Sequence, residues 1–305
     1  MMSLLRHILM GFLLLWTLRA RAQQEATYAQ YMFNGMAINP AYAGQHRALS
    51  VSVLSRFQNV GLPGAPTTQS LSVHSPLANQ RFAVGALFVH DKIGVISQTE
   101  FSGVYAYRIP INPLATLSFG VQAGFSRYNA QYSLLDIYQT DPAFSQDISE
   151  TRPNVGAGVF YDHTTWYAGL SMPHMLNNIF TRGSDMTSVR QSFPVILTAG
   201  YVFPISRAIY LKPNTLVKMV DGRIVEVDIN ANFLFDDVLW FGISYHTSNA
   251  INLLIDLQVT DQLRFGYSYT ASLGEIKTVE IGSHEVFLGY VFKFNSKGIV
   301  SPRYF

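Results

Sequence analysis

Strict alternation of apolar and polar residues is the dominant pattern in this chain from Arg47 onward. In the segment 117–126, LSFGVQAGFS, every odd position is apolar and every even position is small or polar. The segments 225–233, 251–259 and 263–269 repeat this two-residue period. Such alternation is typical of a β-strand with one apolar and one polar face. The pattern therefore predicts an all-β protein.

The same period divides the chain into fourteen expected strands. The connections that follow odd-numbered strands include stretches as long as 129–151 and 173–192, whereas those that follow even-numbered strands are short turns. An even number of strands with long loops at one end and tight turns at the other is typical of an outer-membrane β-barrel. The expected strands are 47–57, 67–76, 81–91, 97–108, 115–128, 152–162, 166–172, 193–204, 207–219, 223–235, 238–248, 250–260, 262–272 and 283–294.

A soluble β-sandwich shows the same alternation, so composition has to separate the two classes. Hydrophobic residues make up 49% of the chain and charged residues 13%, against about 25% charged residues in ordinary soluble domains. The longest uncharged stretch, Ile109 to Ser126, is broken by two prolines and several polar residues, so it does not predict a spanning helix. We therefore expect a transmembrane outer-membrane β-barrel of about 14 antiparallel strands, with its apolar face toward outer-membrane lipid.

Aromatic residues support a membrane barrel over a soluble sandwich. The chain holds 17 Tyr, 21 Phe and 3 Trp, many of them near the ends of expected strands. Amphipathic rings form girdles at both interfaces of membrane barrels, although ordinary core packing is the alternative. The residues expected in girdles are Tyr105, Tyr107, Tyr128, Trp166, Tyr167, Tyr201, Trp240, Tyr245, Tyr267 and Tyr269.

The first 22 residues have the three parts of a secretory signal peptide. Arg6 and His7 precede the apolar run 8–18, and Ala20-Arg21-Ala22 supplies a small-x-small cleavage site. This segment carries three arginines and no acid, so the formal net charge of +2 becomes −1 after its removal. A mature chain with this net charge lacks the excess of basic residues that is typical of nucleic-acid-binding proteins. The absence of cysteine suits export to an oxidising compartment.

Four regions follow from these signals: a signal peptide at 1–22, an N-terminal segment at 23–46, a barrel at 47–294 and a C-terminal tail at 295–305. The segment 23–46 alternates poorly, and Asn39-Pro40 breaks any regular element within it. Barrels of eight strands are filled by their own side chains, and those of 16–18 strands hold a channel. We expect 23–46 to enter the lumen and plug it. Strand parity predicts that both termini are periplasmic.

Catalytic signatures are scarce in this sequence. It contains no G-x-S-x-G elbow, no phosphate-binding G-x-x-x-x-G-K-[ST] loop and no H-E-x-x-H zinc pair. His74-Ser75 leaves open an outer-membrane hydrolase, but lumen-side polar residues explain this pair more simply. We expect no enzyme activity, no cofactor and no metal site. A charge-paired interior is expected from Glu226, Asp228, Asp256, Arg264 and Glu285, which fall on predicted lumen faces.

Several short sequence motifs indicate a family. The segment 30–44, QYMFNGMAINPAYAG, resembles the opening signature of the PorP/SprF family of type IX secretion system membrane proteins from Bacteroidetes. Further similar blocks follow in the family's order at 56–58, 64–77, 91–94, 284–286 and 301–305. The resemblance implies an outer-membrane barrel that serves type IX secretion and, in some relatives, gliding motility.

Family members resemble adaptors, so the resemblance implies two kinds of partner. One is the periplasmic ring of the secretion machine, and the other is the C-terminal domain of a secreted adhesin or other cargo. A general porin or uptake channel remains the main alternative. The residues expected to plug the lumen or to dock on partners are Tyr31, Phe33, Asn39, Pro40, Tyr42, Pro302, Arg303, Tyr304 and Phe305.

Overall fold

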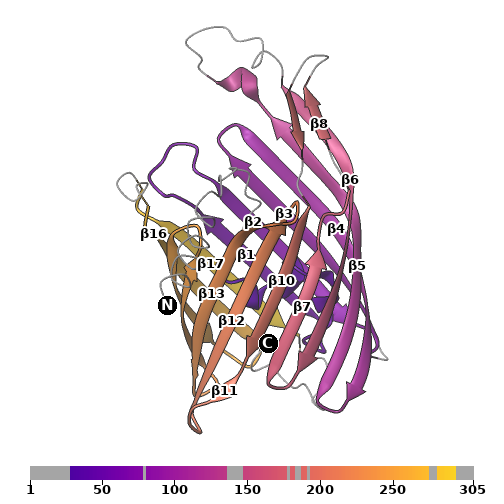
Figure 1. Cartoon of the computed structure of the whole chain (residues 1–305), viewed down its shortest axis with the longest axis vertical. Coiled ribbons are helices and arrows are strands. Elements are labelled where there is room, and N and C mark those ends of the chain that lie inside the picture. Colours follow the sequence, from indigo (N-terminus) through magenta and orange to yellow (C-terminus); the bar gives the residue numbers. More distant parts are fainter. Residues whose placement is uncertain are drawn as a thin grey trace, which may run out of the picture.

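The computed structural model shows a closed antiparallel β-barrel (Figure 1). It describes residues 28–77, 80–135, 147–176, 179–182, 187–190, 193–274 and 280–292. The expected signal peptide and the expected C-terminal tail therefore lie outside the described residues. Among the residues that are described, no helix is long and apolar enough to cross a membrane.

Fourteen strands make up the barrel wall, which confirms the predicted all-β class and strand number. Neighbouring wall strands along the chain pair antiparallel, and pairing of the first with the last closes the ring. The wall strands are β1 (Ser50–Phe57), β2 (Thr67–Pro76), β3 (Phe82–Ile93), β4 (Ile96–Asn112), β5 (Ala115–Ala130), β6 (Ile148–His163), β7 (Trp166–Met172), β10 (Pro194–Tyr201), β12 (Ile209–Val220), β13 (Arg223–Phe235), β14 (Leu239–His246), β15 (Ala250–Gln258), β16 (Leu263–Ser272) and β17 (Ser283–Val291).

Three short strands depart from the expected segmentation. The expected strand 193–204 is interrupted at Val202, so that β11 (Phe203–Pro204) follows β10 as a separate piece. The connection after β7 holds a hairpin of β8 (Ile179–Arg182) and β9 (Thr187–Arg190). This hairpin was not predicted, because neither strand is long enough to show a clear two-residue period.

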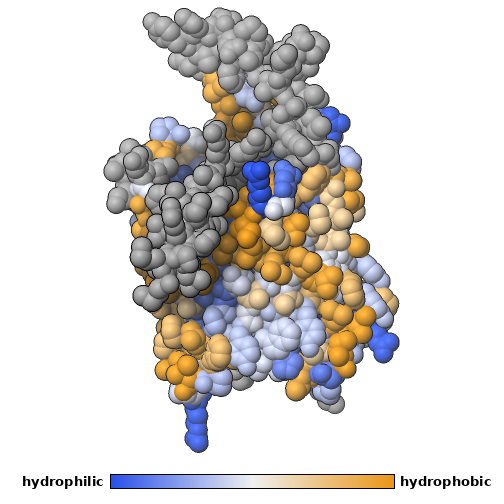
Figure 2. All heavy atoms as spheres, in the orientation of Figure 1, coloured by the Kyte–Doolittle hydropathy of each residue, from blue (hydrophilic) through white to orange (hydrophobic). Residues whose placement is uncertain are grey.

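Alternation along the strands divides the wall into two faces. In β14, Phe241, Ile243 and Tyr245 are exposed, whereas Ser244 and His246 are buried inside the barrel. Other strands repeat this pattern, and apolar side chains cover much of the outer wall (Figure 2). An exposed apolar belt around a polar interior is the arrangement of a transmembrane β-barrel. The structure thus has the apolar face toward lipid and the polar face toward the lumen.

The aromatic girdle prediction is wrong for three residues. Tyr128, Tyr167 and Trp240 face inward and are buried. In Leu239-Trp240-Phe241 both strand faces carry apolar residues, so the two-residue period does not indicate which ring points out. The aromatic residues that are exposed on the outer wall, as predicted, are Tyr105, Tyr107, Trp166, Tyr201 and Tyr245.

The two ends of the barrel differ. The long connections 58–66, 131–147, 173–193 and 273–282 all leave from one end, here called the long-loop end. The opposite end, here called the short-turn end, has only short connections such as 113–114 and 164–165. This difference agrees with the asymmetry expected from the sequence.

At the short-turn end, β4 runs to Asn112, four residues beyond the expected end at 108. At the long-loop end, β6 begins four residues before its expected start at 152, whereas β4 and β5 lie within two residues of their expected bounds. The outer face of β3 to β6 is apolar up to a rung formed by Phe88, Phe101, Phe125 and Pro153, which are paired across these strands. Beyond that rung the outward residues are polar, as in the rung His90, Thr99, Arg127 and Thr151. The expected start of β6, at 152, lies next to this change of polarity, because alternation loses its contrast where both faces are polar.

Candidate functional site

Residues 28–46 fold inside the barrel, and we call them the lumen segment. They form three short 3₁₀ turns, η1 (Tyr31–Phe33), η2 (Gly35–Ala37) and η3 (Pro40–Tyr42), which are seen in indigo within the barrel in Figure 1. Most of these residues are buried. Asn39-Pro40 prevents η2 from continuing as a longer helix, because proline has no N–H to donate and disfavours helical backbone at the residue before it.

The lumen segment crosses the barrel from one end to the other. The backbone N–H groups of Ala29 and Gln30 bind Glu285, which is the third residue of β17 from the long-loop end. At the other extreme, the Gly44 N–H donates to His74 Nδ1, and the Gly44 carbonyl accepts from Arg108, both near the short-turn end. The segment therefore occupies the lumen over most of its length.

A buried carboxylate anchors the beginning of the lumen segment. Glu285 Oε2 accepts the Ala29 N–H at 2.9 Å, and Glu285 Oε1 accepts the Gln30 N–H at 2.8 Å. Arg56 Nη1 lies 3.1 Å from Glu285 Oε2 and completes an ion pair. The Glu285 side chain is 1% exposed. A buried charge is tolerated only when it is paired and hydrogen-bonded, so this anchor depends on both Arg56 and the segment's own backbone.

Tyr31 ties the segment to β13, four strands along the wall from β17. Its hydroxyl donates to Asp228 Oδ1 at 3.3 Å and accepts from Asn230 Nδ2 at 2.8 Å. The whole Tyr31 side chain is buried, with 1% of its surface exposed. Asp228 Oδ2 in turn lies 2.9 Å from His246 Nε2. Strands β13 and β14 are thus joined to the segment through one network.

Asn39 and Pro40 bring the segment into close contact with the wall. Asn39 caps η3 by accepting the Ala41 N–H at 2.9 Å, while its Nδ2 donates to the Val159 carbonyl at 3.0 Å. Pro40 stands at the first position of the turn, where its missing N–H costs nothing. The η3 backbone then lies against Gly120, where a Cβ atom would come within 2.2 Å of the Ala41 nitrogen.

Phe33 packs into an aromatic cluster on β14 and β17. Its ring centroid lies 5.9 Å from that of Trp240 and 6.2 Å from that of Phe287. The Arg264 guanidinium lies over the same ring at 4.5 Å and pairs with Asp256, whose Oδ1 is 2.9 Å from Arg264 Nε. A cation over an aromatic face is favourable, and more so when water is excluded.

Tyr42 closes the segment at the short-turn end. Its ring meets Phe160 edge-on at 5.5 Å, and its hydroxyl lies 3.3 Å from His46 Nε2. The His46 ring packs beside that of His74, with the ring centroids 5.2 Å apart. His46 Nδ1 also lies 2.8 Å from Ser50 Oγ at the start of β1.

The His74-Ser75 pair makes two separate contacts rather than a catalytic one. His74 Nδ1 accepts the Gly44 N–H at 3.1 Å, whereas Ser75 Oγ donates to the Pro76 carbonyl at 3.1 Å. A nucleophile and its base need a hydrogen bond to each other. The observed contacts use His74 to hold the lumen segment.

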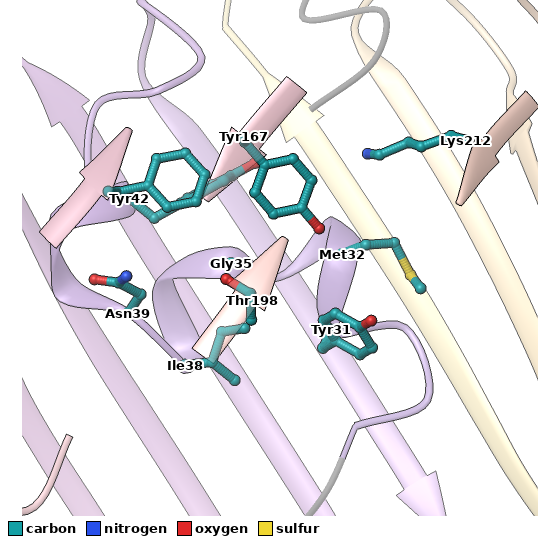
Figure 3. A pocket seen from close by; sticks show the side chains of 10 residues that line it. Tyr31, Met32, Gly35, Ile38, Asn39, Tyr42, Tyr167, Thr198 and Lys212 are labelled. Carbon is teal, nitrogen blue, oxygen red and sulfur yellow. The ribbon is translucent and has the colours of Figure 1, made fainter. Parts of the chain in front are cut away.

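Among the cavities between the segment and the wall in the described part of the chain, two are small. One, of about 20 Å³, is lined by residues that include Tyr31, Tyr42, Tyr167 and Lys212 (Figure 3). The other, of about 40 Å³, lies near the short-turn end. Each has room for about one to three waters, not for a solute path. Within the described ranges, no group of three or more His, Asp or Glu side chains is placed to hold a metal ion.

The structure thus brings together five of the predicted site residues, Tyr31, Phe33, Asn39, Pro40 and Tyr42, in one segment inside the barrel. Pro302, Arg303, Tyr304 and Phe305 lie outside the described residues. Sequence reasoning missed the wall residues Arg56 and Gly120 as partners of the segment. It did place Glu285 and Asp228 on the lumen face, where both are buried.

These features define the class of the protein: an outer-membrane β-barrel whose lumen holds the first described part of its own chain. The sequence matches, over residues 20–290, the family described as type IX secretion system membrane protein PorP/SprF. The chain belongs to this family. It is therefore a membrane component of the type IX secretion system.

Solved structures similar to this chain are other barrels. The CymD monoaromatic hydrocarbon channel is similar at a TM-score of 0.52 and 11% identity, over 85% of this chain and 92% of that chain. A Pseudomonas aeruginosa FadL homologue has a TM-score of 0.46 at 10% identity, covering 81% and 89%. Acinetobacter baumannii Omp33 has a TM-score of 0.44 at 9% identity, covering 81% and 98%. At such identities the likeness concerns the fold alone. No curated protein matches the sequence.

Proposed function

We propose that this protein is a plugged, non-enzymatic outer-membrane adaptor of type IX secretion, which helps to export cargo or to anchor it at the cell surface. The observation that carries this proposal is the filling of the lumen by residues 28–46. A porin needs a continuous aqueous channel, whereas here the segment is hydrogen-bonded to β2, β4, β6, β13 and β17. A general porin or uptake channel is the second candidate, and the barrel fold alone favours it.

The proposed orientation has the short-turn end in the periplasm and the long loops outside the cell, as in other membrane barrels. Strand β17 ends at Val291 at the short-turn end, so the tail that follows starts there and would face periplasmic ring components. The long-loop end would face cargo, such as the C-terminal domain of an adhesin. A periplasmic N-terminus stays a prediction, and the position of Ala29 near the long-loop end gives it no support.

The test of this function combines cells and purified protein. Cells that lack the protein should lose at least one type IX cargo from their surface, as measured by quantitative proteomics of surface and medium. The purified wild-type barrel should show no conductance in a planar lipid bilayer. Open-channel currents in the wild type, together with unchanged cargo, would favour the porin instead.

Removal of residues 301–305 is expected to impair secretion while leaving the barrel assembled. The reason is that Pro302, Arg303, Tyr304 and Phe305 follow the last strand by more than the length of a turn, so they are not needed to close the wall. Cargo in the medium and on the surface should be compared with heat-modifiable gel migration of the barrel. Normal secretion by the truncated protein would argue against docking by the tail.

A further inference from the structure

The outward face of strands β2 to β6 changes from apolar to polar at one height near the long-loop end. These strands lie side by side in the wall (Figure 1). Leu71, Phe88, Phe101 and Phe125 belong to their last apolar rung, and each is at least 40% exposed. Above this rung and within the bounds of these strands, no outward residue is apolar and none is acidic. The rim of the apolar belt therefore crosses β2 to β6 at this rung.

Two exposed cations, Lys92 and Arg127, lie on the polar surface just above the rim. Lys92 on β3 pairs with Ser97 of β4, and Arg127 on β5 pairs with Thr99 of β4. One strand therefore separates the two cations, and Lys92 is one rung higher. A strand spacing of about 4.8 Å and a rise of about 3.4 Å per residue put their Cα atoms on the order of 12 Å apart. Both long side chains can reach one group that lies over β4.

The contacts of these two side chains leave their charge available to an anion. Arg127 Nη2 donates to the Ser149 hydroxyl at 3.2 Å, and this acceptor is neutral. In the part of the chain that the structure describes, neither Lys92 nor Arg127 forms an ion pair. His90 lies in the same outward rung as Arg127, and its Nδ1 is 2.8 Å from Thr99 Oγ1. The surface therefore presents two cations without a counter-ion from its own strands.

The carboxylates of the same strands face the barrel interior. Asp91, Glu100 and Glu150 occupy inward positions, and the last two form ion pairs there. Asp147 is exposed just before β6, but its carboxylate accepts from the N–H and the hydroxyl of Ser133. Positive charge is thus concentrated on the outward side of the wall and negative charge on the inward side. This separation favours an anionic ligand on the outward side.

The position of the two cations at the rim indicates which kind of anion they meet. A lipid whose chains lie on Phe88, Phe101 and Phe125 has its headgroup at the height of Lys92 and Arg127. Long basic side chains at this depth direct their charged ends to the headgroup layer. A guanidinium binds phosphate oxygens in pairs, and an ammonium binds them as a point charge. A soluble anion would meet the cations but not the aromatic rung.

We propose that Lys92 and Arg127 bind the phosphate-bearing headgroup of an outer-leaflet lipid over β4. The inference rests on the orientation proposed above, with the long-loop end outside the cell, and not on the adaptor role. Each cation near an anionic headgroup adds to the binding free energy. A lipid held at this site would also stabilise the folded barrel by mass action.

The first test measures binding of lipid A, a glycolipid with two phosphates, to the purified full-length barrel in non-ionic detergent. The double variant Lys92→Gln with Arg127→Gln should bind it on the order of tenfold or more weakly and should lose the rise in melting temperature that lipid A gives the wild type. The swap of Lys92→Arg with Arg127→Lys keeps both charges and should restore most of the binding.

A single-charge comparison controls for net charge. Arg127→Gln should weaken binding of lipid A, whereas Arg207→Gln should not, because Arg207 is exposed in the connection between β11 and β12 at the short-turn end. Heat-modifiable gel migration shows that each variant is an assembled barrel. Lipid A without its phosphates is the control ligand, and it should bind the wild type and the double variant equally weakly.

A second arm tests the orientation on which the inference rests. The chain has no cysteine, so single cysteines can be labelled on intact cells with a maleimide that does not cross membranes. Leu134→Cys, 67% exposed in the wild type after β5, should be labelled. Ile205→Cys, 60% exposed in the wild type at the short-turn end, should be labelled only after the outer membrane is opened.

Each contrary result overturns a defined part of the inference. Equal binding of lipid A by the wild type and the double variant would remove Lys92 and Arg127 from any site. Binding of inorganic phosphate or of an acidic peptide as tightly as lipid A would exclude a lipid as the occupant. Labelling of Ile205→Cys but not Leu134→Cys on intact cells would overturn the outer leaflet as the location. Loss of the adaptor role alone, seen as unchanged cargo in cells without the protein, would leave this binding as it is.

Discussion

Deletion of residues 28–46 should convert the closed barrel into an ion-conducting pore. The segment fills the lumen between two small cavities, and its removal leaves a fourteen-stranded wall lined by polar side chains. A wall of this size lies between filled eight-stranded barrels and open porins of 16–18 strands, so we expect single-channel currents from the variant where the wild type shows none. Single-channel recording of the purified variant in a planar bilayer measures this.

A point variant tests the same expectation without a deletion. Gly120→Val would place side-chain atoms where the η3 backbone lies, since a Cβ atom at this position meets the Ala41 nitrogen at 2.2 Å. Gly103→Val is the matched control, because a Cβ atom there meets nothing closer than the Ala123 carbonyl oxygen at 3.8 Å. Currents should appear in Gly120→Val and not in Gly103→Val. A deletion variant that assembles yet stays silent would show that the lumen segment is not what closes the barrel.

The fold was predictable because the information that defines it is local. Period-two alternation with contrasting faces fixed fourteen strands within a few residues, as in 117–126 of β5. It failed where contrast is lost: at the start of β6, where residues 149–152 are polar on both faces, and at Trp240, where both faces are apolar. The short hairpin of β8 and β9 was also not predicted, because a strand of four residues is too short to show a clear two-residue alternation.

The lumen segment was only partly predictable for a different reason. The cap on η3 is local, since Asn39 accepts from Ala41 two residues later, and the Asn-Pro pair indicates a turn. The anchor is not local: Ala29 and Glu285 are 256 positions apart. Alternation indicates that Glu285 faces the lumen, but not what meets it there. Two of the three donors to the Glu285 carboxylate are the backbone N–H groups of Ala29 and Gln30. Nearly every residue has such a group, so the residue types do not indicate these two contacts.

Substitution of Glu285 by Ala should release the beginning of the lumen segment. The change removes the acceptor of the Ala29 and Gln30 N–H groups and leaves Arg56 buried without its partner. Breaking a buried ion pair on one side typically costs about 3–5 kcal/mol. Hydrogen exchange of residues 28–34 in detergent, followed by mass spectrometry, should show lost protection. Glu150→Ala is the matched control, because the Glu150–Arg152 pair is part exposed and such pairs contribute about 0–1 kcal/mol.

The double variant Arg56→Ala with Glu285→Ala separates two reasons for that loss. If Glu285 matters only by neutralising Arg56, removing both charges should restore protection of residues 28–34, because no uncompensated charge remains in the barrel. If Glu285 is the anchor, the double variant should regain thermal stability of the wall while the segment stays unprotected, since its two N–H groups still lack an acceptor. We expect the second result. If residues 28–34 stay protected from hydrogen exchange in Glu285→Ala itself, the contacts of Tyr31 and Asn39 would be sufficient to keep the segment in place.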